Sequence, residues 1–123
     1  MVVQRSERGV LAETAALEYL TSRGLRVLTR NYRCRMGEID LVMRDGATLV
    51  FVEVRSRSYH RFGTPAESVN RRKQQKLLAT AQHFLLTHKQ YADTVQRFDV
   101  IAVTTAVAPP QIEWISNAFS TSY

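Results

Sequence analysis

Residues 37–55, with the sequence GEIDLVMRDGATLVFVEVR, contain two apolar segments on either side of an Asp-Gly pair. Apolar alternating runs around Asp-Gly predict a β-hairpin. We expect its strands at about 38–44 and 48–57. Each strand contains a carboxylate, Asp40 or Glu53, where strand interiors disfavour acidic residues. A buried carboxylate must be paired, protonated or bound to a metal, so this hairpin is the first candidate for a functional site.

The position of the hairpin turn determines which residues lie opposite each other. A two-residue turn at 45–46 places Asp40 opposite Phe51 and makes it a diagonal neighbour of Glu53, roughly 7–8 Å away at the backbone. Arg55 shares the face of Glu53 because side chains on a strand alternate with period two. The hairpin therefore presents two carboxylates and one guanidinium together.

Periodicity and turn residues predict the other elements. We expect helices at about 6–23 and 68–89, and further strands at about 25–32, 96–103 and 112–115, with a terminal turn at 117–119. This order, α-β-β-β-α-β-β, predicts an α/β fold with a mixed β-sheet flanked by helices. The second helix lies in a crossover that permits the strands before and after it to pair in parallel.

A third carboxylate is expected to enter the interior from the first helix. On a helical wheel Glu13 lies within the inward stripe, together with Val10, Ala16, Leu17 and Leu20. This helix therefore adds an acidic group from a different element than the hairpin.

Composition narrows the classes of protein. The 123 residues predict a single domain, residues 1–123, and the net charge of +6 favours a polyanionic partner. The single Cys34 excludes a disulfide framework. The N-terminus lacks the apolar region of a signal peptide, and no apolar run is long enough to span a membrane, so we expect a cytoplasmic protein. No P-loop or His-Glu-x-x-His motif is present, so we expect no nucleotide cofactor.

The carboxylates suit hydrolysis of phosphodiester bonds. Mg²⁺, or Mn²⁺ in its place, prefers hard oxygen ligands and needs only one or two carboxylates, which Asp40 and Glu53 supply. Arg55 can stabilise developing charge but stays protonated and cannot act as a base. Further basic residues are expected to contact nucleic acid: Arg33, Arg35, Arg57, Arg61, Arg72, Lys73 and Lys76.

Some of the same residues can instead have purely structural roles. Asp40 and Glu53 can form a salt-bridge network with nearby arginines instead of binding metal. Glu38 is expected to pair with an arginine at the start of its strand. Asp99 is expected to be a buried partner for a backbone group or a basic side chain. The basic residues at the start of the second helix are equally consistent with a solvated face.

The motifs together resemble the YraN family of small uncharacterised bacterial proteins and, more broadly, a PD-(D/E)XK nuclease core. The matching parts are Glu13 on its helix, GEIDL at 37–41, FVEVR at 51–55, Lys73, and RFD at 97–99. The resemblance implies a restriction-endonuclease-like fold, similar to that of archaeal Holliday-junction resolvases.

The same resemblance implies a magnesium-dependent site with Asp40 and Glu53 as ligands and Glu13 as the supplementary carboxylate. Arg55 stands where the superfamily usually has lysine, and the two residues are not interchangeable.

Three hypotheses follow. The first is a metal-dependent endonuclease acting on DNA rather than RNA, on structured substrates, with a homodimer expected if it acts like a resolvase. The second is a non-catalytic nucleic-acid-binding module on the same fold. The third is a protein-interaction domain whose buried carboxylates are only ion-paired.

Overall fold

The structure, a computed structural model, describes residues 6–57 and 65–119 and is built on a five-stranded mixed sheet. The strands lie in the order β1-β2-β3-β4-β5; β3 and β4 are parallel, and every other neighbouring pair is antiparallel. The elements are α1 (Glu7–Ser22), β1 (Arg26–Cys34), β2 (Gly37–Asp45), β3 (Thr48–Ser56), the 3-10 helix η1 (Ala66–Ser68), α2 (Arg71–Thr87), the 3-10 helix η2 (Lys89–Tyr91), β4 (Gln96–Thr104) and β5 (Gln111–Phe119). The predicted fold class and element order are confirmed.

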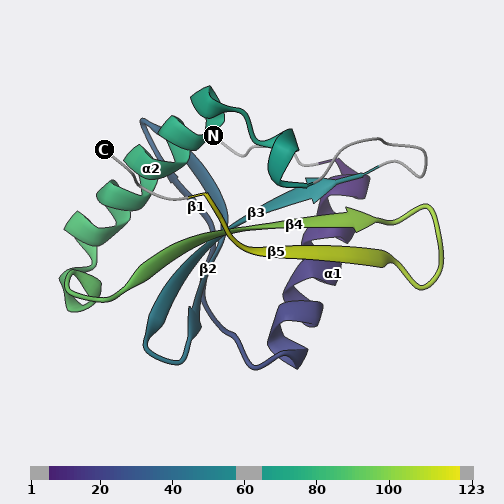
Figure 1. Cartoon of the computed structure of the whole chain (residues 1–123), viewed down its shortest axis with the longest axis horizontal. Helices are drawn as coiled ribbons and strands as arrows, with labels where there is room; N and C mark the ends of the chain where they lie inside the picture. The colour runs from purple at the N-terminus through teal and green to yellow at the C-terminus, as the bar shows by residue number, and fades with distance from the viewer. Residues whose placement is uncertain (1–5, 58–64, 120–123) are drawn as a thin grey trace.

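The two helices cover opposite faces of the sheet (Figure 1). The cluster under α1 includes Ala16, Leu20 and Leu41, whereas the cluster under α2 includes Phe51 and Phe84. Both faces of the central strands are therefore buried, which explains their nearly continuous apolar sequence. No helix among the described residues is long and apolar enough to cross a membrane.

The inward face of α1 differs slightly from the predicted stripe. Ala12, Glu13, Ala16 and Leu20 are buried, but Val10 is 45% exposed, so its predicted core position is wrong. The four-residue spacing of the two alanines and the leucine keeps them on one line of the helix. Small alanine side chains allow this line to approach the sheet closely.

The turn between β2 and β3 lies one residue later than predicted. Asp45 pairs with Thr48, so Gly46 and Ala47 form the turn instead of Asp45 and Gly46. Gly46 has a φ of 59°, which suits the first central position of a type II′ turn. The predicted register is therefore wrong by two residues. A shift of two still places Asp40 on the same face as Glu53, because the strand period is also two.

The last strand is longer than predicted. β5 runs from Gln111 to Phe119, so the short strand at 112–115 and the terminal turn at 117–119 are corrected to one strand. Asn117 has a φ of 54°, and its backbone N–H donates to Asp99 Oδ1 over 2.9 Å. This irregularity redirects the chain without ending the pairing, and Phe119 still pairs with Phe98.

Candidate functional site

The site begins where β2 and β3 stop pairing through their backbones. Their last backbone pair is Leu41 with Val52. In the next position, Asp40 Oδ2 accepts a hydrogen bond from the backbone N–H of Val54 over 2.8 Å. A side chain thus replaces the main-chain partner, and the corrected register brings Asp40 into line with Glu53.

Asp40 and Glu53 form a close acidic pair. The pKa of Asp40 is raised to about 9, first by burial of the carboxyl group and then by a side-chain hydrogen bond with Glu53 and by the negative charge of Glu53. The N–H of Val54 opposes this rise in pKa, and the charge of Glu38 adds to it. The raised pKa of Asp40 favours a proton on this carboxyl group at neutral pH.

Glu53 is short of partners. The residue is only 5% exposed, and Lys73 Nζ lies 3.1 Å from its Oε2. That oxygen nevertheless accepts no hydrogen bond from the part of the chain that the structure describes. A buried carboxylate normally accepts several hydrogen bonds, so Oε2 retains capacity for a further donor or a cation.

Lys73 reaches this pair from the first turn of α2. Asn70 caps the helix, its Oδ1 accepting from the backbone N–H of Lys73 over 2.9 Å, so α2 begins at Arg71 rather than at residue 68. We predicted a phosphate contact for Lys73, and its ion pair with Glu53 was missed. The family resemblance singled out Lys73, but no local pattern in the sequence placed its ammonium beside Glu53.

Glu13 is buried as predicted, but it faces other partners. Its Oε1 accepts from Arg30 Nη2 over 3.2 Å and from Asn31 Nδ2 over 3.2 Å. In residues 6–57 and 65–119, no group of three or more His, Cys, Asp or Glu side chains is arranged to hold a metal ion. The role of Glu13 as a third ligand stays a prediction.

Two other acidic residues have the structural roles that we expected. Arg33 Nε lies 3.3 Å from Glu38 Oε2. Asp99 accepts hydrogen bonds from Arg97 and Trp114. The arginines considered as partners for the Asp40–Glu53 pair are not the ones that bind it, because Lys73 supplies the cation.

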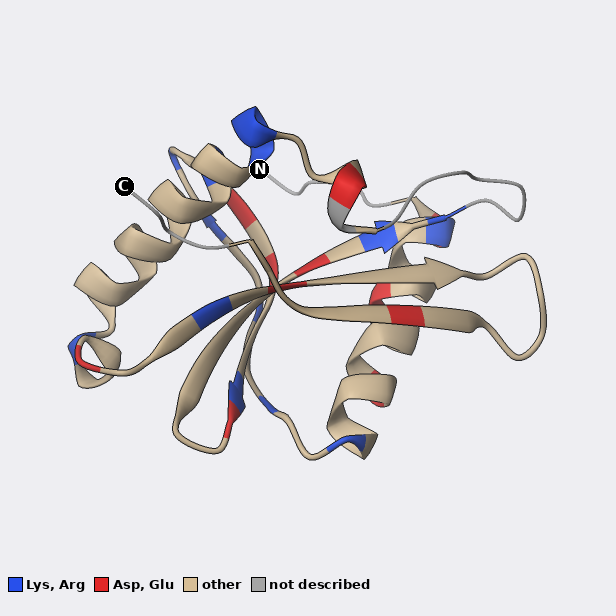
Figure 2. Ribbon diagram, viewed as in Figure 1, with Lys and Arg blue, Asp and Glu red and all other residues tan. Residues whose placement is uncertain are grey.

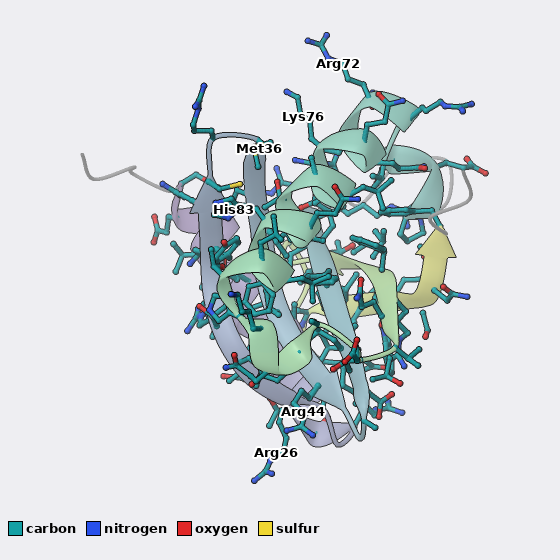
Figure 3. The ribbon with its side chains drawn as sticks, turned by 90° about the vertical axis from the view of Figure 1, so that its left-hand side faces the viewer. Arg26, Met36, Arg44, Arg72, Lys76 and His83 are labelled. Carbon is teal, nitrogen blue, oxygen red and sulfur yellow. The ribbon has the colours of Figure 1, made fainter. Side chains whose placement is uncertain are left out.

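Basic residues surround the site on several elements. Arg35 is exposed in the β1–β2 turn, and this hairpin packs on α2, since a Cβ on Gly37 would lie 3.0 Å from Thr80 Oγ1. Arg72 and Lys76 are exposed on α2 near Met36, at the opposite end from Arg26 and Arg44 (Figure 3).

Basic segments also mark the start of α2 and the end of β3, and several of the acidic segments lie near the middle of the sheet (Figure 2). Arg55 follows Glu53 on β3, and Arg57 comes directly after the end of this strand. Arg61 lies outside the described residues, so its predicted contact with nucleic acid stays a prediction.

The comparisons with known proteins agree on one family. The profile of the uncharacterised protein family UPF0102 matches residues 12–103. A UPF0102 protein of Methylococcus capsulatus is 55% identical over 121 residues, covering 96% of this chain and 97% of the relative. A UPF0102 protein of Saccharophagus degradans is 49% identical over 119 residues, covering 97% of this chain and 98% of the relative.

Proposed function

Because this chain belongs to the uncharacterised protein family UPF0102, we propose its function from the site itself. We propose a metal-dependent endonuclease that hydrolyses phosphodiester bonds in nucleic acid, with structured DNA as the substrate class. The observation that carries this proposal is the Asp40–Glu53 pair, in which Asp40 has its pKa raised to about 9 and Glu53 retains a buried oxygen that accepts no hydrogen bond from residues 6–57 and 65–119. Such a pair favours either a proton or a cation.

The residues present fit Mg²⁺ or Mn²⁺. Asp40 and Glu53 offer hard carboxylate oxygens, and Mg²⁺ needs only one or two of these because it keeps several waters. When bound, the ion would polarise the phosphate and lower the pKa of an attacking water. The proton on Asp40 would leave as the ion binds, since ligands must be deprotonated.

The cationic side chains have separate tasks in this proposal. Lys73, within 3.1 Å of Glu53 Oε2, neutralises the pair before substrate arrives. Its flexible stem lets the ammonium move to the scissile phosphate once Glu53 has another cation. Arg55, on the same face of β3, holds the phosphate and stabilises its charge without exchanging a proton.

The surroundings of the pair suit a polyanionic substrate. The chain has a net charge of +6, and exposed Arg35, Arg72 and Lys76 lie on the hairpin and helix next to the site. Such a surface attracts phosphates regardless of sequence, so affinity should fall steeply with salt. The resemblance to PD-(D/E)XK nucleases supports the same substrate. A homodimer would supply two sites for two strands.

A cleavage assay tests the proposal. Wild type, Glu53→Gln and Glu18→Gln would be incubated with labelled single-stranded, duplex, flap and four-way DNA and with RNA, in Mg²⁺, Mn²⁺ or EDTA. We expect metal-dependent cleavage that Glu53→Gln lowers by about 100-fold or more. Glu18 is exposed on α1, so Glu18→Gln should cleave like wild type. Equal cleavage by wild type and Glu53→Gln would refute the assignment.

The replacement of the usual lysine by Arg55 favours one second candidate, a non-catalytic nucleic-acid-binding module. Salt-dependent binding by gel shift, with no cleavage of any substrate in either metal, is the result that this candidate predicts.

A further inference from the structure

A pocket lies beyond Glu53, at the carboxyl ends of the parallel strands β3 and β4. Its volume is about 260 Å³, and its walls are residues 54–56 of β3 with Arg57 after them, Ala102 of β4, Pro65, and Ser68 of η1. The carboxyl ends of parallel strands are where α/β sheets commonly bind ligands. The function proposed above uses only Arg55 from the wall of this pocket.

Two guanidinium groups give the pocket its chemistry. Arg57 Nη1 lies 3.0 Å from Glu113 Oε1, and the Arg57 side chain is only 18% exposed, so its position is fixed by β5. Arg55 is partly buried and has neither a hydrogen bond nor an ion pair with another described residue. The described wall of the pocket therefore carries two guanidinium groups, whose planar donors suit phosphate.

The size and position of the pocket restrict what it can hold. Typical small-molecule pockets measure roughly 300–1,000 Å³, so this one suits a single phosphate with its sugar. At a rise of roughly 3.3 Å per residue, Arg57 lies roughly 13 Å along β3 from Glu53. A phosphate held by Arg57 is thus a different one from the phosphate beside the carboxylates.

We propose that this pocket binds a second phosphate group of a nucleic-acid strand, separate from the scissile one. The nucleic-acid identity of the ligand rests on the proposed function, but the phosphate chemistry rests on Arg55 and Arg57 alone. The phosphate is either a terminal phosphomonoester or an internal phosphodiester, which share the same donors. Binding here would fix the distance between the cleaved bond and a second point on the strand.

Titration of inorganic phosphate tests the pocket without metal or cleavage. The full chain in EDTA at constant ionic strength would be followed by backbone amide shifts. We expect saturable shifts at residues 54–57 and Ala102. Arg57→Gln should weaken binding about 5-fold or more, whereas the matched change Arg26→Gln, at the other end of the molecule (Figure 3), should change it less than about 2-fold.

A change of opposite sign provides a second test. Glu113→Gln removes the carboxylate that competes with phosphate for Arg57, so binding should strengthen about 2-fold or more. The charge-matched control is Glu18→Gln on α1. Shifts that do not saturate would overturn the proposal, and so would equal losses of phosphate affinity in Arg57→Gln and Arg26→Gln. If Arg57→Gln is unstable, Glu113→Gln still tests the pocket independently.

Oligonucleotides with a 5′-phosphate or a 5′-hydroxyl, again in EDTA, distinguish a terminal phosphomonoester from an internal phosphodiester as the ligand. Tighter binding of the phosphorylated strand, lost in Arg57→Gln, assigns the pocket to strand ends. Equal binding of both strands, weakened equally by Arg57→Gln, assigns it to an internal phosphodiester. If Arg57→Gln affects neither strand, nucleic acid is not the ligand. Because these titrations contain no metal, phosphate binding without cleavage would refute only the nuclease proposal.

Discussion

The Asp40–Glu53 pair and the Asp99 cluster each contain a buried acidic residue, Glu53 or Asp99, yet the donors that these residues meet differ. In the Asp99 cluster (Asp99, Arg97, Trp114 and Asn117), Oδ1 accepts from Arg97 Nε over 3.1 Å and from the Asn117 N–H over 2.9 Å. Oδ2 accepts from Trp114 Nε1 over 2.9 Å. Both oxygens are therefore satisfied by donors from β4 and β5.

The Asp40–Glu53 pair has fewer donors and two carboxyl groups. One backbone N–H reaches Asp40, one ammonium reaches Glu53, and Asp40 takes up a proton to reduce the repulsion. The comparison teaches that burial of an acid alone does not indicate function. A carboxylate surrounded by donors stabilises the fold, whereas one short of donors retains affinity for a proton or a cation.

The largest loss of stability is expected in the Asp99 cluster, where both carboxylate oxygens accept hydrogen bonds. Asp99→Ala removes the acceptor of Arg97, Trp114 and Asn117, and leaving such a buried charge and its donors unpaired costs about 3–5 kcal/mol. Urea unfolding followed by circular dichroism measures this loss. Asp93→Ala, on an exposed turn, is the control and should change stability by less than about 0.5 kcal/mol. A similarly small loss in Asp99→Ala would remove the distinction between the two regions.

Asp40→Asn is expected to raise the free energy of unfolding rather than lower it. The amide has the shape of the protonated acid and needs no proton, so at pH 8 the variant should be more stable than wild type, by up to about 1.4 kcal/mol for each pH unit above about 4. Its affinity for Mn²⁺, measured by calorimetry, should fall at the same time. A loss of stability as large as that of Asp99→Ala would show that Asp40 is structural.

The pH dependence of stability sharpens the same point. The pKa of Asp40 is about 9 in the folded chain and near 4 when unfolded, so the folded state binds more protons between these values. Stability should therefore fall as pH rises from about 4 to about 9, by at most about 1.4 kcal/mol per pH unit. Unfolding of wild type and Asp40→Asn across this range measures the difference, which is predicted to vanish near pH 4. Parallel curves would contradict the raised pKa.

The smallest effect on stability concerns Lys73. Its side chain is 41% exposed, so Lys73→Gln should cost less than about 1 kcal/mol despite the short ion pair. Cleavage, in contrast, should fall much further in Lys73→Gln than in Lys76→Gln, which removes an exposed charge three residues away. If both variants cleave equally, Lys73 contributes only general attraction to the substrate.

Much of the fold followed from local patterns. The Asp-Gly pair between apolar runs predicted the hairpin, and alternation placed Asp40 and Glu53 on one face. The turn itself was predicted one residue too early, because the sequence alone does not show which residue adopts the positive φ of Gly46. The predicted register was wrong by two residues, so Asp40 and Glu53 still share a face. The observed register brings these two carboxylates closer together than the prediction did.

The candidate site was predicted only in part. The buried position of Glu13 followed from the helical period, but its partners Arg30 and Asn31 lie on a strand whose side-chain directions depend on an irregular backbone at Asn31. The ion pair of Lys73 with Glu53 depends on how α2 lies on the sheet, which no local pattern contains.

The sequence by itself therefore determined the elements, their order, the buried faces and the acidic residues within them, because periods of two and 3.6 residues act between near neighbours. Only the tertiary structure decided which donors each carboxylate meets. Those donors come from distant parts of the chain, and packing brings them to Asp99 but leaves Glu53 with one ammonium and an oxygen without a hydrogen bond among the described residues.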